Sequence, residues 1–322
     1  MAYTNAQATP RSDIHSLVQQ ANADFNQLLI ADKIFPVYGS EVKRGIYMKA
    51  LLANAELLNA DAAARESGAS YKRVNRKFDT DTFDCVEYGL ETAIDDSYES
   101  EVERFMNLEA TEAGLLERSL RLSYEARIAA LFVTGNFPAT AAGVSYTETN
   151  LATINFAADV AAAQQRGLKN GKIFNSLVMS KPVFDTLRRS PLLQNQIYGV
   201  VPRAAGQNAM PGEQDIAHAL GFENIFVAKA AKNANAKGQS YSGSFIWANT
   251  YVAVCEVKSG EFQAGGLGRT IQWTKDTTGL FTPETYRDDR IRSNVLRVRQ
   301  NVSEKIIDAT ACEMITTSWS AS

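Results

Sequence analysis

The sequence contains very little of the chemistry on which most enzymes depend. It has only two histidines, His15 and His218, and three cysteines, Cys85, Cys255 and Cys312. A Ser-His-Asp triad, a His-Glu-x-x-His zinc site or a three-histidine site needs more histidine or a different spacing. Three widely spaced cysteines make neither a disulfide framework nor a Cys-x-x-Cys metal site, so we expect reduced, packed thiols. We therefore predict no catalytic, cofactor-binding or metal-binding residue and no enzyme.

Long apolar runs and a strong net charge are also missing. No run approaches the ~18 apolar residues that cross a bilayer, so no membrane partner is expected. The first residues, MAYTNAQATPRSDIH, lack the basic-then-apolar order of a secretion signal, which predicts an intracellular protein or one released by another route. The net charge is −3, which argues against sequence-specific DNA recognition. Such a nearly neutral chain resists self-association only weakly.

An acidic stretch raises the question of a metal site. Residues 76–97, RKFDTDTFDCVEYGLETAIDDS, contain Asp79, Asp81 and Asp84. An EF-hand loop needs glycine at its sixth position and glutamate at its twelfth, and DTDTFD lacks this glycine. The neighbouring Phe83 and Val86 are strand formers. The stretch therefore predicts a strand with polar edges rather than a metal site.

The acidic stretch ends a segment, residues 41–93, that is predicted to form a long hairpin. GIYMKALL (45–52) has strand character, NAELLNADAAARES (54–67) has helical composition, and SYKRVNRKFDTDTFDCVEY (70–88) returns as a strand. Positive charge gathers in the return strand. Two interpretations stay open: a solvated basic arm, or an arm that lies on an acidic neighbour. The basic residues concerned are Lys72, Arg73, Arg76 and Lys77.

The strongest periodic pattern lies between residues 98 and 133. Apolar residues step by three or four from Val102 to Leu131, and no proline interrupts them. This predicts one helix with one apolar face and with several glutamates in its first turns, ended by Gly135 and Pro138. At 1.5 Å per residue it would reach ~50 Å, which is the length of a strut rather than of an ordinary core helix.

The remaining segments alternate between helix and strand. Residues 12–35 are predicted as a short helix that Pro36 ends. In residues 154–260, Pro182 and Pro191 fit first helical turns, and Gly221 fits a left-handed C-cap. SLVMS (176–180) and NIFVA (224–228) are predicted strands, and GSFIWANTYVAVCEV (243–257) is predicted as two strands joined by an Asn-Thr turn. Residues 290–303 alternate at period two, and residues 304–319 are predicted as a final strand.

Five arginines and two aspartates lie within the period-two strand or just before it. Three interpretations stay open for the guanidinium groups: carboxylates of a neighbouring subunit, DNA phosphates, or solvent. The arginines are Arg287, Arg290, Arg292, Arg297 and Arg299, offset by Asp288 and Asp289.

Several stretches, taken in order, resemble the major capsid protein of tailed bacteriophages, which has the Hong Kong 97-type fold. FDTDTFDCVEYGLETAIDDSYES resembles the return strand of the family's extended loop and the start of its spine helix. SLVMSKPVFDTLRRSPLLQNQIYG and DIAHALGFENIFVAKAAKNANAKG, followed by GSFIWANTYVAVCEV, resemble its axial domain. TYRDDRIRSNVLRVRQNVSEKIIDATACEMI resembles the C-terminal strands of its peripheral domain.

The resemblance implies an α+β fold divided along the chain. Residues 1–40 would be an N-terminal arm, 41–93 the extended loop, and 94–150 the peripheral domain with the spine helix. Residues 151–260 would be the axial domain, and 261–322 the return to the peripheral domain.

The resemblance also implies a function. Copies would assemble as hexamers and pentamers into an icosahedral shell around double-stranded DNA, in the virion capsid, after assembly in the host cytoplasm. A separate scaffolding protein, a portal protein and a possible decoration protein would be partners, and DNA contact would be nonspecific. The alternative is the shell of a cellular encapsulin-like nanocompartment that packages protein cargo. Candidate subunit-interface residues are Lys72, Arg73, Arg76, Lys77, Asp79, Asp81, Arg287, Arg290, Arg292, Arg297 and Arg299.

Overall fold

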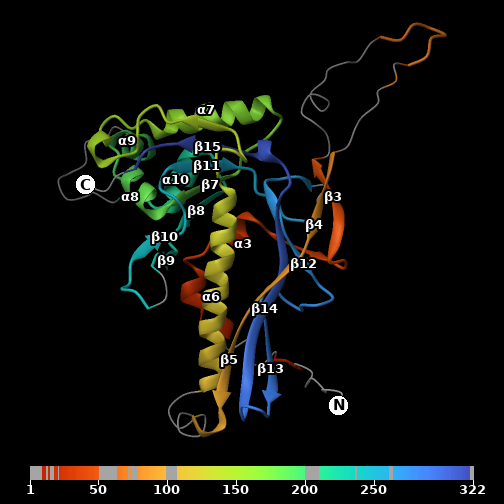
Figure 1. The fold of residues 1–322 in the computed structure, drawn as a ribbon. Coiled ribbons are helices and arrows are strands. Elements are labelled where there is room, and N and C mark those ends of the chain that lie inside the picture. Colours follow the sequence, from red (N-terminus) through yellow and green to blue (C-terminus); the bar gives the residue numbers. More distant parts are fainter. Residues whose placement is uncertain are drawn as a thin grey trace.

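The computed structural model places an upper body, a lower body built along one helix, and a projecting arm whose root lies on the lower body (Figure 1). The ranges that the structure describes are 9–11, 14, 18–20, 22–50, 64–71, 73, 79–98, 107–199, 210–235, 238–260 and 264–319.

The upper body is a five-stranded sheet covered by helices. Its strands, in spatial order, are β6 (Ala139–Ala141), β15 (Cys312–Thr316), β11 (Tyr251–Cys255), β7 (Ser176–Ser180) and β8 (Asn224–Ala228). Every residue of β7 and β11 is buried, as expected for central strands with both faces covered. The helices are α7 (Phe156–Lys169), α8 (Lys181–Leu187), α9 (Pro191–Tyr198) and α10 (Glu213–Leu220), with the short 3-10 turn η1 (Glu148–Asn150) between β6 and α7.

The lower body is a six-stranded sheet with the long helix α6 (Leu108–Leu131) packed along it (Figure 1). The order is β1 (Thr9–Pro10), β13 (Thr282–Asp288), β14 (Ser293–Ile306), β12 (Gly268–Trp273) and β2 (Val37–Ser40), and β5 (Val86–Asp95) pairs with β14. The period-two prediction for β14 is confirmed, because Leu296 and Val298 are buried in the apolar clusters that also contain residues of α6.

Local sequence signals located several elements correctly. SLVMS and NIFVA are β7 and β8, and Pro182 and Pro191 lie in the first turns of α8 and α9. Gly221 ends α10 with φ 75° and ψ 30°, the predicted left-handed cap. All three cysteines are buried free thiols, as predicted.

The long helix is shorter than predicted. Asn107 has extended backbone angles (φ −73°, ψ 100°), and its side chain accepts a hydrogen bond from the N–H of Ala110 at 3.0 Å. This N-cap starts α6 at Leu108, so one helix from residue 98 is wrong. The 24 residues of α6 extend about 36 Å rather than ~50 Å. The glutamates Glu99, Glu101 and Glu103, predicted for the first turns, lie outside the described residues.

Other expectations on connections are also wrong. Instead of one helix, the N-terminal segment contains α2 (Ala23–Asn26) and α3 (Ala31–Ile34), separated by a turn. β10 (Gly243–Phe245) pairs with β9 (Ala231–Asn233) and not with β11. The final strand begins only at residue 312, after the short turn η3 (Ala309–Ala311), because β14 continues to Ile306.

The two sheets do not follow the predicted domain ranges at their edges. β15 comes from the range expected to return to the peripheral domain, yet it pairs with β11. β6 comes from the range that contains α6, yet it pairs with β15. The upper sheet is therefore built from three separate parts of the chain, which ties the two bodies together.

Candidate assembly surfaces

The root of the arm is an antiparallel hairpin, as predicted, with a shift in register between Met48 and Ala50. β3 (Arg44–Ala50) pairs antiparallel with β4 (Asp79–Asp84), with Arg44 opposite Asp84. Tyr47 and Phe83 are buried in an apolar cluster with Cys85, and the Tyr47 hydroxyl donates to the carbonyl of Ile306 at 3.3 Å. The arm is thus anchored on the lower sheet before it leaves the body.

The aspartates of DTDTFD lie in a strand, which confirms the strand prediction. Asp84 forms an ion pair with Arg44 at 2.9 Å, and Asp81 with Lys49 at 3.7 Å. The N–H of Thr82, with smaller contributions from nearby lysines, lowers the pKa of Asp81. Asp79 is the first residue of β4. Within the described ranges, no group of three or more His, Cys, Asp or Glu residues could hold a metal ion.

The described part of the arm beyond its root stands away from both bodies (Figure 1). The Arg65 guanidinium donates to the carbonyl of Ala69 at 2.6 Å and lies 4.8 Å from the centre of the Tyr71 ring. Tyr71 is 74% exposed, and Arg73 is also exposed. Lys72, Arg76 and Lys77 lie outside the described residues, as does most of the stretch predicted to be helical.

The arginines of the β13–β14 hairpin are largely paired within their own chain. Arg287 contacts both carboxylate oxygens of Asp96, at 2.5 and 2.7 Å, and this hydrogen bonding lowers the pKa of Asp96. Arg290 pairs with Asp288 at 3.2 Å. Arg292 is exposed in the turn, with a left-handed φ of 49°.

A denser ion-pair cluster lies further along the sheet. Arg299 donates to Glu284 and Asp276, at 2.8 and 2.6 Å, and Arg297 donates to Glu284 at 2.7 Å. Burial alone would raise the pKa of Glu284, but the hydrogen bonds from both arginines outweigh it and the net pKa is lowered. The three partners predicted for these arginines did not include carboxylates of their own sheet. The antiparallel register that places Glu284 opposite Arg297 could not be read from the sequence.

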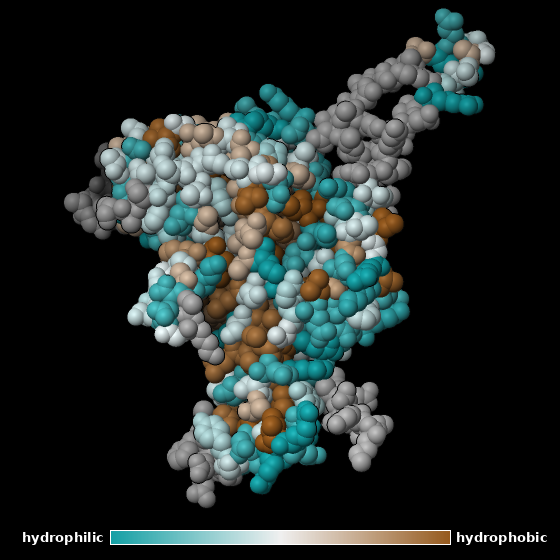
Figure 2. Space-filling view, viewed as in Figure 1, coloured by the Kyte–Doolittle hydropathy of each residue, from teal (hydrophilic) through white to brown (hydrophobic). Residues whose placement is uncertain are grey.

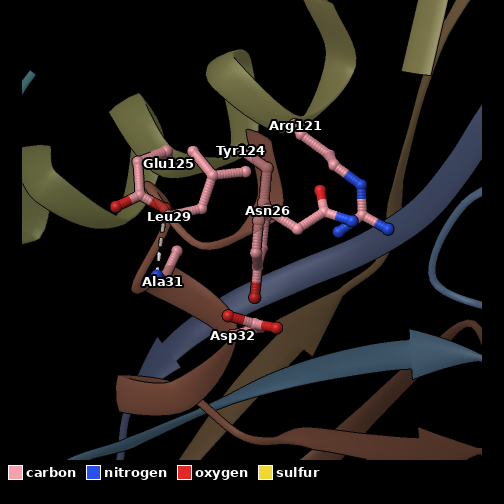
Figure 3. Close-up of a pocket in the computed structure, with 7 residues that line it drawn as sticks. All are labelled: Asn26, Leu29, Ala31, Asp32, Arg121, Tyr124 and Glu125. Carbon is pink, nitrogen blue, oxygen red and sulfur yellow. Dashed lines mark hydrogen bonds between the residues drawn. The ribbon is translucent and has the colours of Figure 1, made fainter. Parts of the chain in front are cut away.

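A buried carboxylate that no sequence pattern revealed attaches α6 to two other segments, and Figure 3 shows its hydrogen bond to one of them, at Ala31. Glu125 is 1% exposed and accepts hydrogen bonds from the N–H of Ala31 at 2.9 Å and the N–H of Ile30 at 3.1 Å. It also accepts from the indole N–H of Trp247 at 2.6 Å. Glu125 therefore caps α3 from a distant helix, and burial raises its pKa despite these donors. The surrounding pocket is lined by Asn26, Leu29, Ala31, Asp32, Arg121, Tyr124 and Glu125.

Arginines of α6 reinforce this attachment. Arg121 pairs with the buried Glu117 at 2.7 Å, and its guanidinium lies 4.4 Å from the centre of the Phe281 ring. Arg127 lies 3.8 Å from the centre of the Tyr88 ring on β5. Stacked guanidinium groups bury their planes while keeping their donors available, so α6 packs through charged residues as well as apolar ones. No helix in the described part of the chain is long and apolar enough to cross a membrane.

Comparison with known proteins finds solved structures with the same fold but no match at the level of sequence. No family model and no curated protein matches the sequence. Among solved structures, a phage-related protein from Bordetella bronchiseptica RB50 superposes with a TM-score of 0.68 at 16% identity, covering 96% of this chain and 97% of that one. The capsid of cyanophage P-SCSP1u gives a TM-score of 0.56 at 11% identity, with 99% and 91% covered.

A third solved structure is a virus-like particle from Pyrococcus furiosus, with a TM-score of 0.53, 10% identity, and 93% and 96% covered. These matches extend over nearly the whole of each chain. This chain therefore has the Hong Kong 97-type fold of phage capsid proteins.

Proposed function

We propose that this chain is a major capsid protein that self-assembles, as hexamers and pentamers, into an icosahedral shell around double-stranded DNA. Its fold, shared with capsid proteins, supports a structural role in a shell made of many copies. A separate scaffolding protein, a portal protein and nonspecific contact with DNA are part of the proposal. Location in the virion capsid after assembly in the host cytoplasm belongs to it as well. So do the axial, peripheral and extended-loop ranges given above, with β6 and β15 assigned to the axial sheet.

The exposed root of the arm carries the proposal. Ile46 is 73% exposed and Val42 is 53% exposed, although both side chains are apolar. The described end of the arm stands away from both bodies (Figure 1), so it does not fold back to cover them. An arm that projects from the body and leaves apolar side chains uncovered at its root is expected to lie against other copies.

The test is assembly of the purified protein, with and without the scaffolding protein of the same genome. We expect megadalton particles in sedimentation velocity and closed shells in electron microscopy. A protein that stays monomeric or dimeric under every assembly condition would contradict the proposal.

A second candidate is the shell of a protein-packaging nanocompartment. The observation that favours it is the structural match to a virus-like particle from Pyrococcus furiosus, which is as extensive as the match to the cyanophage capsid. Native particles separate the two functions. Double-stranded DNA inside them supports the capsid, and protein cargo without DNA supports the nanocompartment.

A further inference from the structure

Carboxylates are concentrated on the chain from β4 through β5, without basic residues among them. Residues 79–98 contain seven carboxylates and no lysine or arginine. Asp81, Asp84 and Asp96 are paired with basic residues of other segments. Of the other four, Asp79 begins β4 and three lie on β5, and we call these three, Glu87, Glu91 and Asp95, the acid row.

The acid row lies on one accessible face. Its members are spaced four residues apart in a strand, which puts them on the same side at intervals of about 13 Å. Tyr88 and Ile94, on the other side of β5, are the residues that pack inward, with Tyr88 under an arginine of α6. All three carboxylates are exposed, and in the described residues β5 forms its ladder with β14 alone.

The acid row is only partly neutralised by its own chain. Glu87 is 3.5 Å from Arg299, but that guanidinium already bonds Glu284 and Asp276 more closely. Glu91 accepts a hydrogen bond from the neutral hydroxyl of Tyr286 at 3.2 Å. Asp95 accepts from the N–H of Ser97 at 2.9 Å. Neither Glu91 nor Asp95 has an ion-pair partner among the described residues.

The arm has the opposite charge. Residues 64–77 carry five basic side chains against one carboxylate, Glu66. Of these basic residues, Arg65 and Arg73 are described, and both are exposed. The described end of the arm points away from the β5 of its own chain (Figure 1) and forms a separate lobe in the space-filling view (Figure 2). Its own acid row is therefore not the surface on which it lies.

We propose that the acid row of one copy receives the basic arm of a second copy, through exposed ion pairs that include Arg65 and Arg73. The inference rests on the proposed shell, which supplies the second copy. Individually such exposed pairs are weak and screened by salt, so their effect comes from repetition over many identical contacts.

Reciprocal charge reversal tests the pairing in the full-length chain. One variant carries Glu87→Lys, Glu91→Lys and Asp95→Lys, a second carries Arg65→Glu and Arg73→Glu, and a third combines all five changes. Like charges face each other in the first two, so we expect shell yield to fall roughly ten-fold or more. The combined variant restores opposite charges and should recover the wild-type yield. A control with the same charge change elsewhere, Asp24→Lys, Glu112→Lys and Glu223→Lys, should assemble normally.

Wild-type assembly, measured beside the variants, separates this inference from the proposed function. If the wild type forms no shells, the function fails. If the wild type and the acid-row variant form equal amounts of shell, the pairing is wrong and the function stands. Loss without recovery in the combined variant would also overturn the pairing. Normal shells from the neutral variant, Glu87→Gln, Glu91→Gln and Asp95→Asn, would also overturn the pairing. The carboxylates would then serve only to protect an open strand edge from aggregation. Circular dichroism and melting of each unassembled variant confirm that its subunit folds.

Discussion

Replacement of Glu125 by alanine should destabilise the subunit strongly, because one carboxylate satisfies donors from two other segments. Three buried N–H groups, of Ile30, Ala31 and the Trp247 indole, would lose their acceptor. Each unsatisfied buried donor costs about 1–3 kcal/mol. Removing a buried anion recovers part of its desolvation, so we expect a net loss of about 3 kcal/mol.

The assay is denaturant unfolding of the unassembled subunit, followed by the fluorescence of Trp247 after the other two tryptophans are changed to phenylalanine. Glu112→Ala, a matched change on a less buried turn of α6, should alter the unfolding free energy by less than about 0.5 kcal/mol. If Glu125→Ala also changes the unfolding free energy by no more than that, the three hydrogen bonds to Glu125, of which Figure 3 shows the one from Ala31, do not hold the segments together.

The pH dependence of the same site has a defined sign. Burial raises the pKa of Glu125 above its ordinary value of 4.5. The folded state then binds the proton more tightly than the unfolded state, so this group's contribution to stability falls as pH rises through the window above 4.5. Glu125→Gln cannot titrate, and its stability relative to the wild type should therefore improve across that window.

Three further predictions concern the sheet, a close approach and the arm. Arg299→Ala leaves the buried Glu284 with one guanidinium and should cost about 3 kcal/mol in denaturant unfolding. Because the pKa of Glu284 is lowered, the wild type should lose the stability of this cluster as pH falls below the ordinary value of 4.5, and the variant should lose less. Gly268→Ala would place its Cβ 2.2 Å from a buried phenylalanine ring and should lower stability by about 2 kcal/mol, whereas Gly135→Ala, in open space, should not. Deletion of residues 50–75 should leave a subunit with wild-type circular dichroism that forms no stable shells, and normal shells would refute the role of the arm.

Elements whose signals are local could be located from the sequence. A proline in a first turn and a glycine after a last turn act through their own backbone angles, so Pro182 and Gly221 mark their helices without help from the rest of the fold. Short apolar runs such as residues 176–180 need both faces covered, and this alone predicts central strands. The hairpin at the root of the arm could also be predicted, because the alternation of apolar and polar residues that indicates its strands lies within β3 and β4 themselves.

Elements that depend on distant partners could not be located in this way. The apolar period continues on both sides of Asn107, and only the hydrogen bond to Ala110 shows that α6 begins there. Glu117 and Glu125 are buried, although helical patterns place glutamate on the outside. The partner of Glu117 is Arg121, four residues further along the same helix, and this spacing could be read from the sequence. The partners of Glu125 are Trp247 and the N-terminal segment, and no pattern within α6 reveals them.

The arginine-rich strand shows how such distant pairing changes a functional argument. In the sequence, residues 287–299 carry more positive than negative charge, so the arginines are the residues expected to bind a partner. In the structure four of the five arginines already bond carboxylates of their own chain, at Asp96, Asp288, Glu284 and Asp276. Glu284 and Asp276 neutralise Arg297 and Arg299 inside the sheet. The charge that remains at the edge of the sheet is therefore that of the acid row, which is negative. A second copy that approaches this edge therefore meets carboxylates, and the exposed arm, with Arg65 and Arg73 among its basic residues, has the charge that suits them.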